Sequence, residues 1–398
     1  MLQEFNTFSD ISNKMKNPDT QINFITDNIG LNEILSRCVS HASDIFVSGN
    51  SNKNLNVFVK DNDNVISVES NNLKQLLNLA EKSYFGKGSE TILDESVRKA
   101  KEIKKNNLLV ANEDVFFKDI TYKIRLGLNI SHNLRFELHK LNFYETGSFF
   151  NAHKDTLYDS DHIATLLILL PFEFSGGELY VQFENYINEC FKRQNHNFTN
   201  NWCCFFTDCA HEVSPVTSGT RVTLQYNVYI DRTTKPIRSI DKSYIADDII
   251  ENLTLRKDKR YTFNDNVFFE IVTFLTNTLN NTTIGLVLKH NYHKFTSIDN
   301  LKGFDKKIYE YLLSTQLFNL NIEAISIISR LSDNNKNTKF YDCKLLGTML
   351  SSKNYNIQNI YVGTSANYKE IENNQYTGNE SQAGDNIYTN LVLLINMI

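Results

Sequence analysis

Two histidines and one aspartate have the types and spacing of a metal site. His153 and Asp155 stand two positions apart in the tripeptide HKD, and His211 follows 58 positions later. In an extended chain, residues i and i+2 point to the same side, so His153 and Asp155 can share one ion. Two imidazoles and one carboxylate on one face of a metal leave the opposite face open, as in non-haem iron(II) sites. These residues therefore predict an iron site with open positions.

Arg221 lies ten positions after His211 and could serve as an anion clamp. From a strand beside the metal, its guanidinium could hold a carboxylate through two parallel hydrogen bonds. Each piece also has an ordinary explanation, because an H-x-D tripeptide is most often a surface turn and an arginine on a strand is usually solvated. The joint pattern is more specific, since all four residues fall in one β-rich stretch.

That stretch changes to a period of two at residue 134. In LRFELHKLNFY, the apolar residues Leu134, Phe136 and Leu138 alternate with polar ones, as in a half-buried strand. Polar turns then separate further short apolar runs, and Gly176-Gly177 is the clearest break. The runs are IATLLILLPF, ELYVQF, NWCCFF and RVTLQYNVYI. They predict an antiparallel sandwich or jelly roll over residues 134–231, with residues 184–201 as an exposed loop.

The flanks of this stretch are mixed, so the chain is expected to be α+β. We predict three parts: a mixed, partly helical region (1–133) that supports the core, the β-domain (134–231), and an α/β extension of unknown role (232–398). Asp94 is a good N-cap for a helix over ESVRKAKEIKK. The other expected elements are helices at 31–39, 73–82, 304–313 and 321–331, a strand at 55–59, and a buried strand in the final LVLLINMI.

Composition excludes several classes of protein. The chain has 398 residues, 41% of them hydrophobic, and a net charge of −5, so no basic surplus exists to neutralise nucleic-acid phosphates. The N-terminus has no signal-peptide pattern, and the longest apolar run, Ile163–Phe172, is too short to span a bilayer. Six cysteines do not form a disulfide pattern. We therefore expect a soluble protein of the cytoplasm or nucleus, without membrane or nucleic-acid partners.

Three motifs resemble one family. They are Tyr144-x-x-Gly147-x-x-Phe150-x-x-His153-x-Asp155, the hairpin SGGEL (175–179), and HEVSPVTSGTR (211–221). Together they resemble the prolyl 4-hydroxylase and hypoxia-factor prolyl hydroxylase group of the Fe(II)/2-oxoglutarate-dependent dioxygenases. The resemblance covers about residues 134–231. It departs from the family at Phe150 and Leu169, where tyrosines are common, and at Asn227, where a tryptophan is frequent.

The resemblance implies a double-stranded β-helix that uses Fe(II), 2-oxoglutarate and O2, with ascorbate as an accessory reductant. His153, Asp155 and His211 would bind the iron, while Arg221, with Tyr144 and Thr165, would bind 2-oxoglutarate. The implied reaction hydroxylates a residue of a protein or peptide, with proline favoured, and releases succinate and CO2. The loop TLYDSDH (156–162) follows the metal strand and could influence the choice of substrate.

Two more segments resemble uncharacterised, mostly lower-eukaryote or viral-type proteins of the same superfamily. They are FGKGSETILDESVRKA (85–100) and YTGNE (376–380), whose glycines could also simply supply turns.

Four alternatives remain open from the sequence. Cys203, Cys204 and Cys209 cluster near His211 and could bind zinc. The domain could be a degenerate oxygenase fold that binds proteins without catalysis. It could also be a small-molecule hydroxylase, or a nucleic-acid demethylase, against which the net charge argues.

Overall fold

The computed structural model describes most of the chain. The described residues are 23–24, 45–87, 90–183, 194–196, 201–233, 265–279, 283–293, 295–330, 340–345, 357–361, 376–377 and 388–398. The helix expected at 31–39 and most of the loop expected at 184–201 lie outside them. No helix in this part of the chain is both long and apolar enough to cross a membrane.

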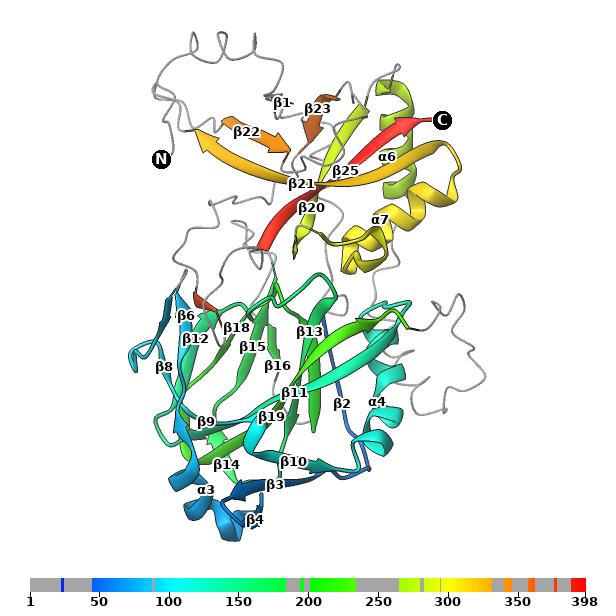
Figure 1. Ribbon diagram of the computed structural model, residues 1–398. Helices are drawn as coiled ribbons and strands as arrows, with labels where there is room; N and C mark the ends of the chain where they lie inside the picture. The colour runs from blue at the N-terminus through cyan, green and yellow to red at the C-terminus, as the bar shows by residue number, and fades with distance from the viewer. Residues whose placement is uncertain are drawn as a thin grey trace.

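A large antiparallel sheet forms one layer of the β-rich half (Figure 1). Its strand order is β2-β17-β13-β19-β11-β9-β5, with the short β14 also paired to β19. The long pair β11 and β19 forms its centre and runs side by side from Asn133 against Asp231 to Glu145 against Thr220. The strands are β2 (Phe46–Gly49), β5 (Glu81–Lys82), β9 (Lys101–Lys104), β11 (Asn133–Glu145), β13 (His162–Leu169), β14 (Phe174–Gly176), β17 (Trp202–Phe206) and β19 (Val216–Asp231).

A smaller antiparallel sheet forms the facing layer, in the order β16-β15-β18-β12-β8. Its strands are β8 (Arg98–Lys99), β12 (Phe149–His153), β15 (Leu179–Gln182), β16 (Gln194–His196) and β18 (Ala210–Val213). Gly176 and Gly177 both have positive φ where the chain turns between the layers, and there a side chain would be strained. All five strands predicted between residues 134 and 231 are therefore present.

Strand β19 has one apolar face and one polar face, and both are buried. Val222, Leu224, Tyr226 and Val228 alternate with Arg221, Thr223, Gln225 and Asn227, and all eight are buried. On the apolar side lies helix α4 (Glu113–Gly127), whose Phe117 ring meets the Tyr226 ring edge-on at 5.0 Å. On the polar side lies the space between the two sheets. A buried polar row is costly unless it has partners or a ligand, so this face is the place to look for a site.

Two small sheets and one helix complete the N-terminal half. The first sheet, β10-β3-β4, contains the strand predicted near 55–59, and helix α3 corresponds to the helix predicted at 73–82. The second, β24-β6-β7, pairs Tyr376 and Thr377 with Lys87 and Gly86, which brings the two motifs outside the core together. The bounds are β3 (Asn56–Asp61), β4 (Asn64–Ser67), α3 (Leu73–Leu79), β6 (Phe85–Lys87), β7 (Glu90–Ile92), β10 (Leu108–Ala111) and β24 (Tyr376–Thr377).

The C-terminal residues build a second core, drawn above the first in Figure 1. A six-stranded sheet in the order β1-β22-β21-β25-β20-β23 packs against two helices, and only β20 and β23 pair in parallel among its described strands. We call residues 265–398 of this core the C-terminal unit. Its elements are α6 (Asp265–Thr278), β20 (Thr283–His293), α7 (Gly303–Ser314), β21 (Phe318–Arg330), β22 (Phe340–Leu345), β23 (Ile357–Tyr361) and β25 (Tyr388–Met397); β1 is Asn23–Phe24.

The structure shows strands where two helices were predicted, one in each half of the protein. A predicted helix and a predicted final strand in the C-terminal unit are confirmed. Within residues 95–105, strands β8 and β9 form instead, because pairing with β12 and β11 outweighs local helix propensity. Asp94 accepts hydrogen bonds from Ser96 in a turn. Of the helix predicted at 321–331, the described residues 321–330 belong to strand β21, as their β-branched isoleucines favour. Helix α7 and the buried final strand β25 are as predicted.

Candidate metal and cosubstrate site

The three predicted metal ligands converge at one end of the small sheet. His153 ends β12 and His211 lies in β18, where they are direct partners across the antiparallel pair. Asp155 follows β12, and its Oδ1 lies 3.8 Å from Nε2 of His211. One potential ligand atom from each of the three residues lies within 4.8 Å of the others, and all three residues are buried. Within the described part of the chain, this is the group arranged to hold a metal ion.

Backbone carbonyls orient both imidazoles. Nδ1 of His153 donates to the carbonyl oxygen of Asn151 at 2.8 Å, and Nδ1 of His211 donates to that of Cys209 at 3.1 Å. A carbonyl oxygen can only accept, so the proton stays on Nδ1 and the Nε2 lone pair is left for a metal. Burial, and then the neighbouring His211, hold the pKa of His153 well below its usual range. This favours the neutral form, which is the form that binds metals.

A hydroxyl orients the carboxylate. Oγ1 of Thr165, from β13 in the facing sheet, donates to Oδ2 of Asp155 at 2.5 Å, while the backbone N–H of Asp155 donates to Thr207. Oδ1 is then the oxygen that faces His211. Two imidazole nitrogens and one carboxylate oxygen on one side of a point fit Fe(II). The donor chemistry of the site therefore suits the metal expected from the sequence.

The cysteines do not suit zinc. Cys203, Cys204 and Cys209 are fully buried and free. Burial raises the pKa of the Cys203 and Cys209 thiols well above the usual value, so these thiols stay protonated. Zinc binds thiolates rather than thiols, and the zinc alternative is therefore disfavoured.

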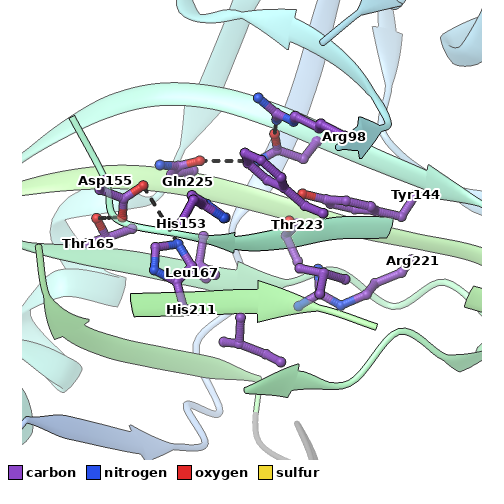
Figure 2. Close-up of a pocket in the computed structure, with 14 residues that line it drawn as sticks. Arg98, Tyr144, His153, Asp155, Thr165, Leu167, His211, Arg221, Thr223 and Gln225 are labelled. Carbon is purple, nitrogen blue, oxygen red and sulfur yellow. Dashed lines mark hydrogen bonds and ion pairs between the residues drawn. The ribbon is translucent and has the colours of Figure 1, made fainter. Parts of the chain in front are cut away.

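A pocket between the two sheets leads away from the metal group (Figure 2). His153, Asp155 and His211 lie toward one side of this view, and Arg221 and Tyr144 lie toward the other. Arg221 and Tyr144 are direct partners across β19 and β11, and the guanidinium carbon lies 5.6 Å from the centre of the tyrosine ring. The lining residues are Arg98, Asn142, Tyr144, Phe150, His153, Asp155, Thr165, Leu167, Leu179, His211, Val213, Arg221, Thr223 and Gln225.

The charge at the far end is deeply buried. Arg221 is only 1% exposed, and burial lowers the pKa of its guanidinium. A desolvated cation is stabilised by an anion that joins it in the same low-dielectric space. A small dicarboxylate could thus span the pocket, with one end at the metal and the other at Arg221.

Phe150 contacts the metal group through its ring. It stacks on the His153 imidazole with 3.5 Å between ring centres and 17° between planes, and the guanidinium carbon of Arg98 lies 4.6 Å from the centre of the Phe150 ring. The phenylalanine that departs from the family pattern therefore packs against the ring of a candidate metal ligand. Leu169 and Asn227, the two other departures, are not among the lining residues.

Several lining residues were not predicted from the sequence. Arg98 donates to Asn142, whose amide nitrogen donates to Gln225, and behind them Glu102 bridges Arg98 and Lys140. Burial raises the pKa of Glu102. The positive charges of Lys140 and Arg98 have the larger opposite effect and lower this pKa to about 2. The alternation of polar residues in β19 could have identified Thr223 and Gln225. For Arg98, which lies 55 positions before the triad, we find no such signal.

The loop after the metal strand is packed rather than solvated. Thr156, Leu157 and His162 are buried, and Asn300 of the C-terminal unit donates to Ser160 and Asp161. The loop thus belongs to the contact between the two halves of the protein, and its influence on substrate choice stays a prediction.

Comparisons agree with this geometry. Residues 139–229 match the family model of the 2OG-Fe(II) oxygenase superfamily. No protein of curated function matches the chain. Among solved structures, a prolyl 4-hydroxylase from Pseudomonas putida is 14% identical over 41% of this chain and 83% of its own, with a TM-score of 0.29. A Trichoplax adhaerens prolyl hydroxylase, solved with a hypoxia-inducible factor peptide fragment, is 14% identical over 57% and 95%, also with a TM-score of 0.29.

A viral collagen prolyl hydroxylase from Paramecium bursaria Chlorella virus-1, solved with 2-oxoglutarate, is 19% identical over 33% of this chain and 80% of its own, with a TM-score of 0.23. Because these identities and TM-scores are low, the assignment rests on the family model and on the His-Asp-His group. Fe(II) and 2-oxoglutarate are the cofactor and cosubstrate of this superfamily. The resemblance seen in the sequence is confirmed: residues 139–229 form a 2OG-Fe(II) oxygenase domain.

Proposed function

We propose that this protein is an Fe(II)- and 2-oxoglutarate-dependent oxygenase that hydroxylates a residue of a protein substrate, with proline favoured. The observation that carries the oxygenase assignment is the pocket that joins the buried His-Asp-His group to the buried Arg221. We further infer that the two facing sheets form a double-stranded β-helix, that residues 1–133 support it by adding strands β2, β5, β8 and β9 to the sheets, and that residues 232–398 form an extension.

In this proposal His153, Asp155 and His211 hold the iron. Both imidazoles offer Nε2, and Thr165 keeps the Asp155 carboxylate turned toward them. Iron bound with 2-oxoglutarate would supply the oxidation by O2 that hydroxylates the substrate and releases succinate and CO2. The protein contributes the geometry of the ligands and excludes water from the pocket.

Arg221 would hold the distal carboxylate of 2-oxoglutarate. Its fork of N–H donors matches a carboxylate, and its burial makes each charged hydrogen bond stronger than it would be in water. The Tyr144 hydroxyl comes from the neighbouring strand and could donate to the same group. The hydroxyl of Thr165 already donates to Asp155, so its contact with 2-oxoglutarate stays a prediction.

The choice of a protein substrate rests on the resemblance of the core motifs, including the 144–155 segment and the SGGEL hairpin. The test offers the purified full chain, loaded with Fe(II), a library of proline-containing peptides and a set of free amino acids, with succinate as the readout. Asp155→Ala serves as the inactive control. We expect peptide-dependent succinate; turnover coupled only to free amino acids would instead identify a small-molecule hydroxylase.

The catalytically degenerate alternative has its own outcome. A binding module without catalysis would form no succinate above the Asp155→Ala background, with any peptide or without one. The complete set of buried ligands argues against that alternative, because buried histidines and a buried carboxylate are costly to keep without a function.

A further inference from the structure

Both segments that carry the candidate metal ligands contact the C-terminal unit. One segment is His153–Asp155, and the other runs from Thr207 to His211. Strands β20 and β25 reach toward these segments from the second core (Figure 1). Side chains that lie 82 to 233 positions away in the sequence thus form hydrogen bonds with these segments.

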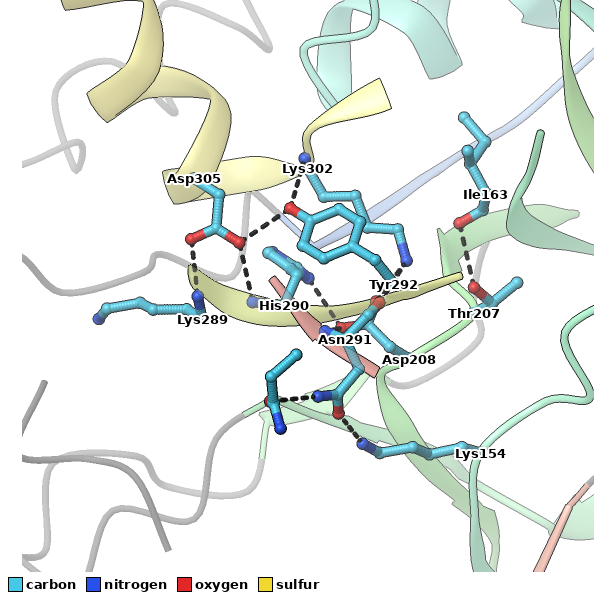
Figure 3. Close-up of polar contacts among 11 residues, drawn as sticks. Lys154, Ile163, Thr207, Asp208, Lys289, His290, Asn291, Tyr292, Lys302 and Asp305 are labelled. Carbon is cyan, nitrogen blue, oxygen red and sulfur yellow. Dashed lines mark hydrogen bonds and ion pairs between the residues drawn. The ribbon is translucent and has the colours of Figure 1, made fainter. Parts of the chain in front are cut away.

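Asp208 is the centre of the first contact (Figure 3). Its Oδ2 accepts hydrogen bonds from Nδ1 of His290 and from the backbone N–H of Asn291, both at 2.9 Å, and its Oδ1 accepts one from Nζ of Lys302 at 2.9 Å. Asp208, His290 and Lys302 are all buried. Burial opposes ionisation of Asp208, but the charge of Lys302 and then His290 outweigh it and lower the pKa of Asp208.

This contact fixes the strand that carries His211. Asp208 immediately precedes Cys209, whose carbonyl oxygen accepts the hydrogen bond from Nδ1 of His211. The position of that carbonyl sets the direction in which the imidazole offers Nε2. A shift of the 207–209 turn would therefore change the ligand geometry at His211.

The second contact fixes the segment that carries Asp155, directly after β12. The hydroxyl of Tyr388, in β25, donates to the backbone carbonyl of Asp155 at 3.0 Å. Next to it, Nζ of Lys154 donates to Oδ1 of Asn291 at 2.7 Å, and the backbone N–H of Asn291 donates to Asp208. Asn291 therefore links the two ligand-bearing segments to each other through the C-terminal unit.

These contacts are specific polar interactions, several of which involve charged groups, and they differ from the apolar packing that usually joins two cores. An interface between two apolar cores needs no buried charges, and burying Asp208 and Lys302 is favourable only when both have complete partners. On the oxygenase side, the contacts are made at Asp155 and at residues within three positions of Asp155 or His211. The C-terminal side chains that make these contacts do not line the pocket. Groups behind metal ligands typically decide how well the ligands are oriented.

We propose that the C-terminal unit positions the metal ligands, with Tyr388 and Asn291 as positioning residues that set the affinity and geometry of the metal site. The proposal rests on the metal site of the proposed function. It assigns a role to residues 265–398, which the oxygenase domain match at 139–229 does not include.

The test uses the full chain, with Co(II) as the probe because its visible d–d spectrum reports coordination geometry. The variants are Tyr388→Phe, which removes one hydroxyl and keeps the ring, and Asn291→Ala. Asp208 is left intact, because its loss would leave Lys302 buried without its carboxylate partner. The matched control is Tyr226→Phe, another buried hydroxyl, whose partner Glu113 lies on the far face of the large sheet.

We expect Tyr388→Phe and Asn291→Ala each to weaken Co(II) binding about tenfold, the lower end of the range for groups behind metal ligands, and to alter the d–d spectrum. The control should bind Co(II) as the wild type does, even if its unfolding midpoint falls as far as the midpoints of Tyr388→Phe and Asn291→Ala. Wild-type affinity and spectrum in both variants would overturn the proposal. A wild-type protein that binds no Co(II), or binds it equally after Asp155→Ala, would instead overturn the metal site itself.

Discussion

Replacing Arg221 by methionine tests the carboxylate clamp most directly. Methionine keeps most of the length of the side chain and removes the charge and all donors. The Arg221 side chain lies deep between the sheets at 1% exposure, so water cannot take over its hydrogen bonds. The free energy of the lost hydrogen bonds should therefore appear in full as weaker 2-oxoglutarate binding.

The magnitude follows from the number of bonds lost. Hydrogen bonds to charged groups contribute roughly 1.5–3 kcal/mol each, and a bidentate pair of the weaker kind is worth about 3 kcal/mol. At about 1.4 kcal/mol per tenfold, the dissociation constant of 2-oxoglutarate should rise roughly 150-fold. Arg221→Lys keeps the charge without the fork, and it should cost about tenfold.

Isothermal titration calorimetry, with Mn(II) in place of Fe(II) so that no turnover occurs, measures the dissociation constants of both metal and 2-oxoglutarate. Metal affinity should stay near the wild-type value, because no metal ligand changes. The metal-free variant should unfold no earlier than the wild type, since replacing a buried ion by an apolar group is often neutral or stabilising. An unchanged 2-oxoglutarate affinity in Arg221→Met would refute the clamp and move the anchor elsewhere in the pocket.

Three other predictions concern the metal group and a buried histidine. His153→Ala, Asp155→Ala and His211→Ala should each abolish Fe(II)-dependent formation of succinate, and wild-type turnover in any of them would remove that residue from the site. Thr165→Val, which keeps the shape and removes the donor to Asp155, should weaken Mn(II) binding by roughly tenfold in a calorimetric titration. Burial lowers the pKa of His162 to about 3, so below pH 6.5 the unfolded chain binds a proton that the folded protein does not, and stability falls as the pH falls toward 3. One unit below 6.5 the contribution is about 1.4 kcal/mol, and urea unfolding at pH 7.5 and 5.5 should show a smaller difference in His162→Phe.

The core of the site was predictable because its signals are local. Strands of period two mark their own buried faces. His153 and Asp155 lie two positions apart, His211 and Arg221 lie ten apart, and all four fall within one β-rich stretch. The structure places these residues together as the sequence indicated. The row from Arg221 to Gln225 also carries a signal, because polar residues alternate with apolar ones in a strand buried on both faces.

The rest depends on contacts between distant segments. Arg98 enters the pocket only because β8 pairs with β12, and the helix pattern of residues 95–105 concealed that pairing. The helix predicted at 321–331 shows the same limit, since strand β21 is stabilised by pairing with β25 near the end of the chain. Tyr388 and Asn291 carry no local sign of their contacts with residues 154 and 155.

The ion pair between Asp208 and Lys302 sets an order of events during synthesis. Asp208 leaves the ribosome before His290 and Lys302, which follow it by 82 and 94 residues. At ~5–20 residues per second this delay lasts roughly 4–20 s. During that time Asp208 lacks the hydrogen bonds from His290 and Lys302, so we expect the turn before His211 to stay hydrated. If the proposed role of the C-terminal unit holds, we therefore expect a half-made chain to bind iron more weakly than the finished protein.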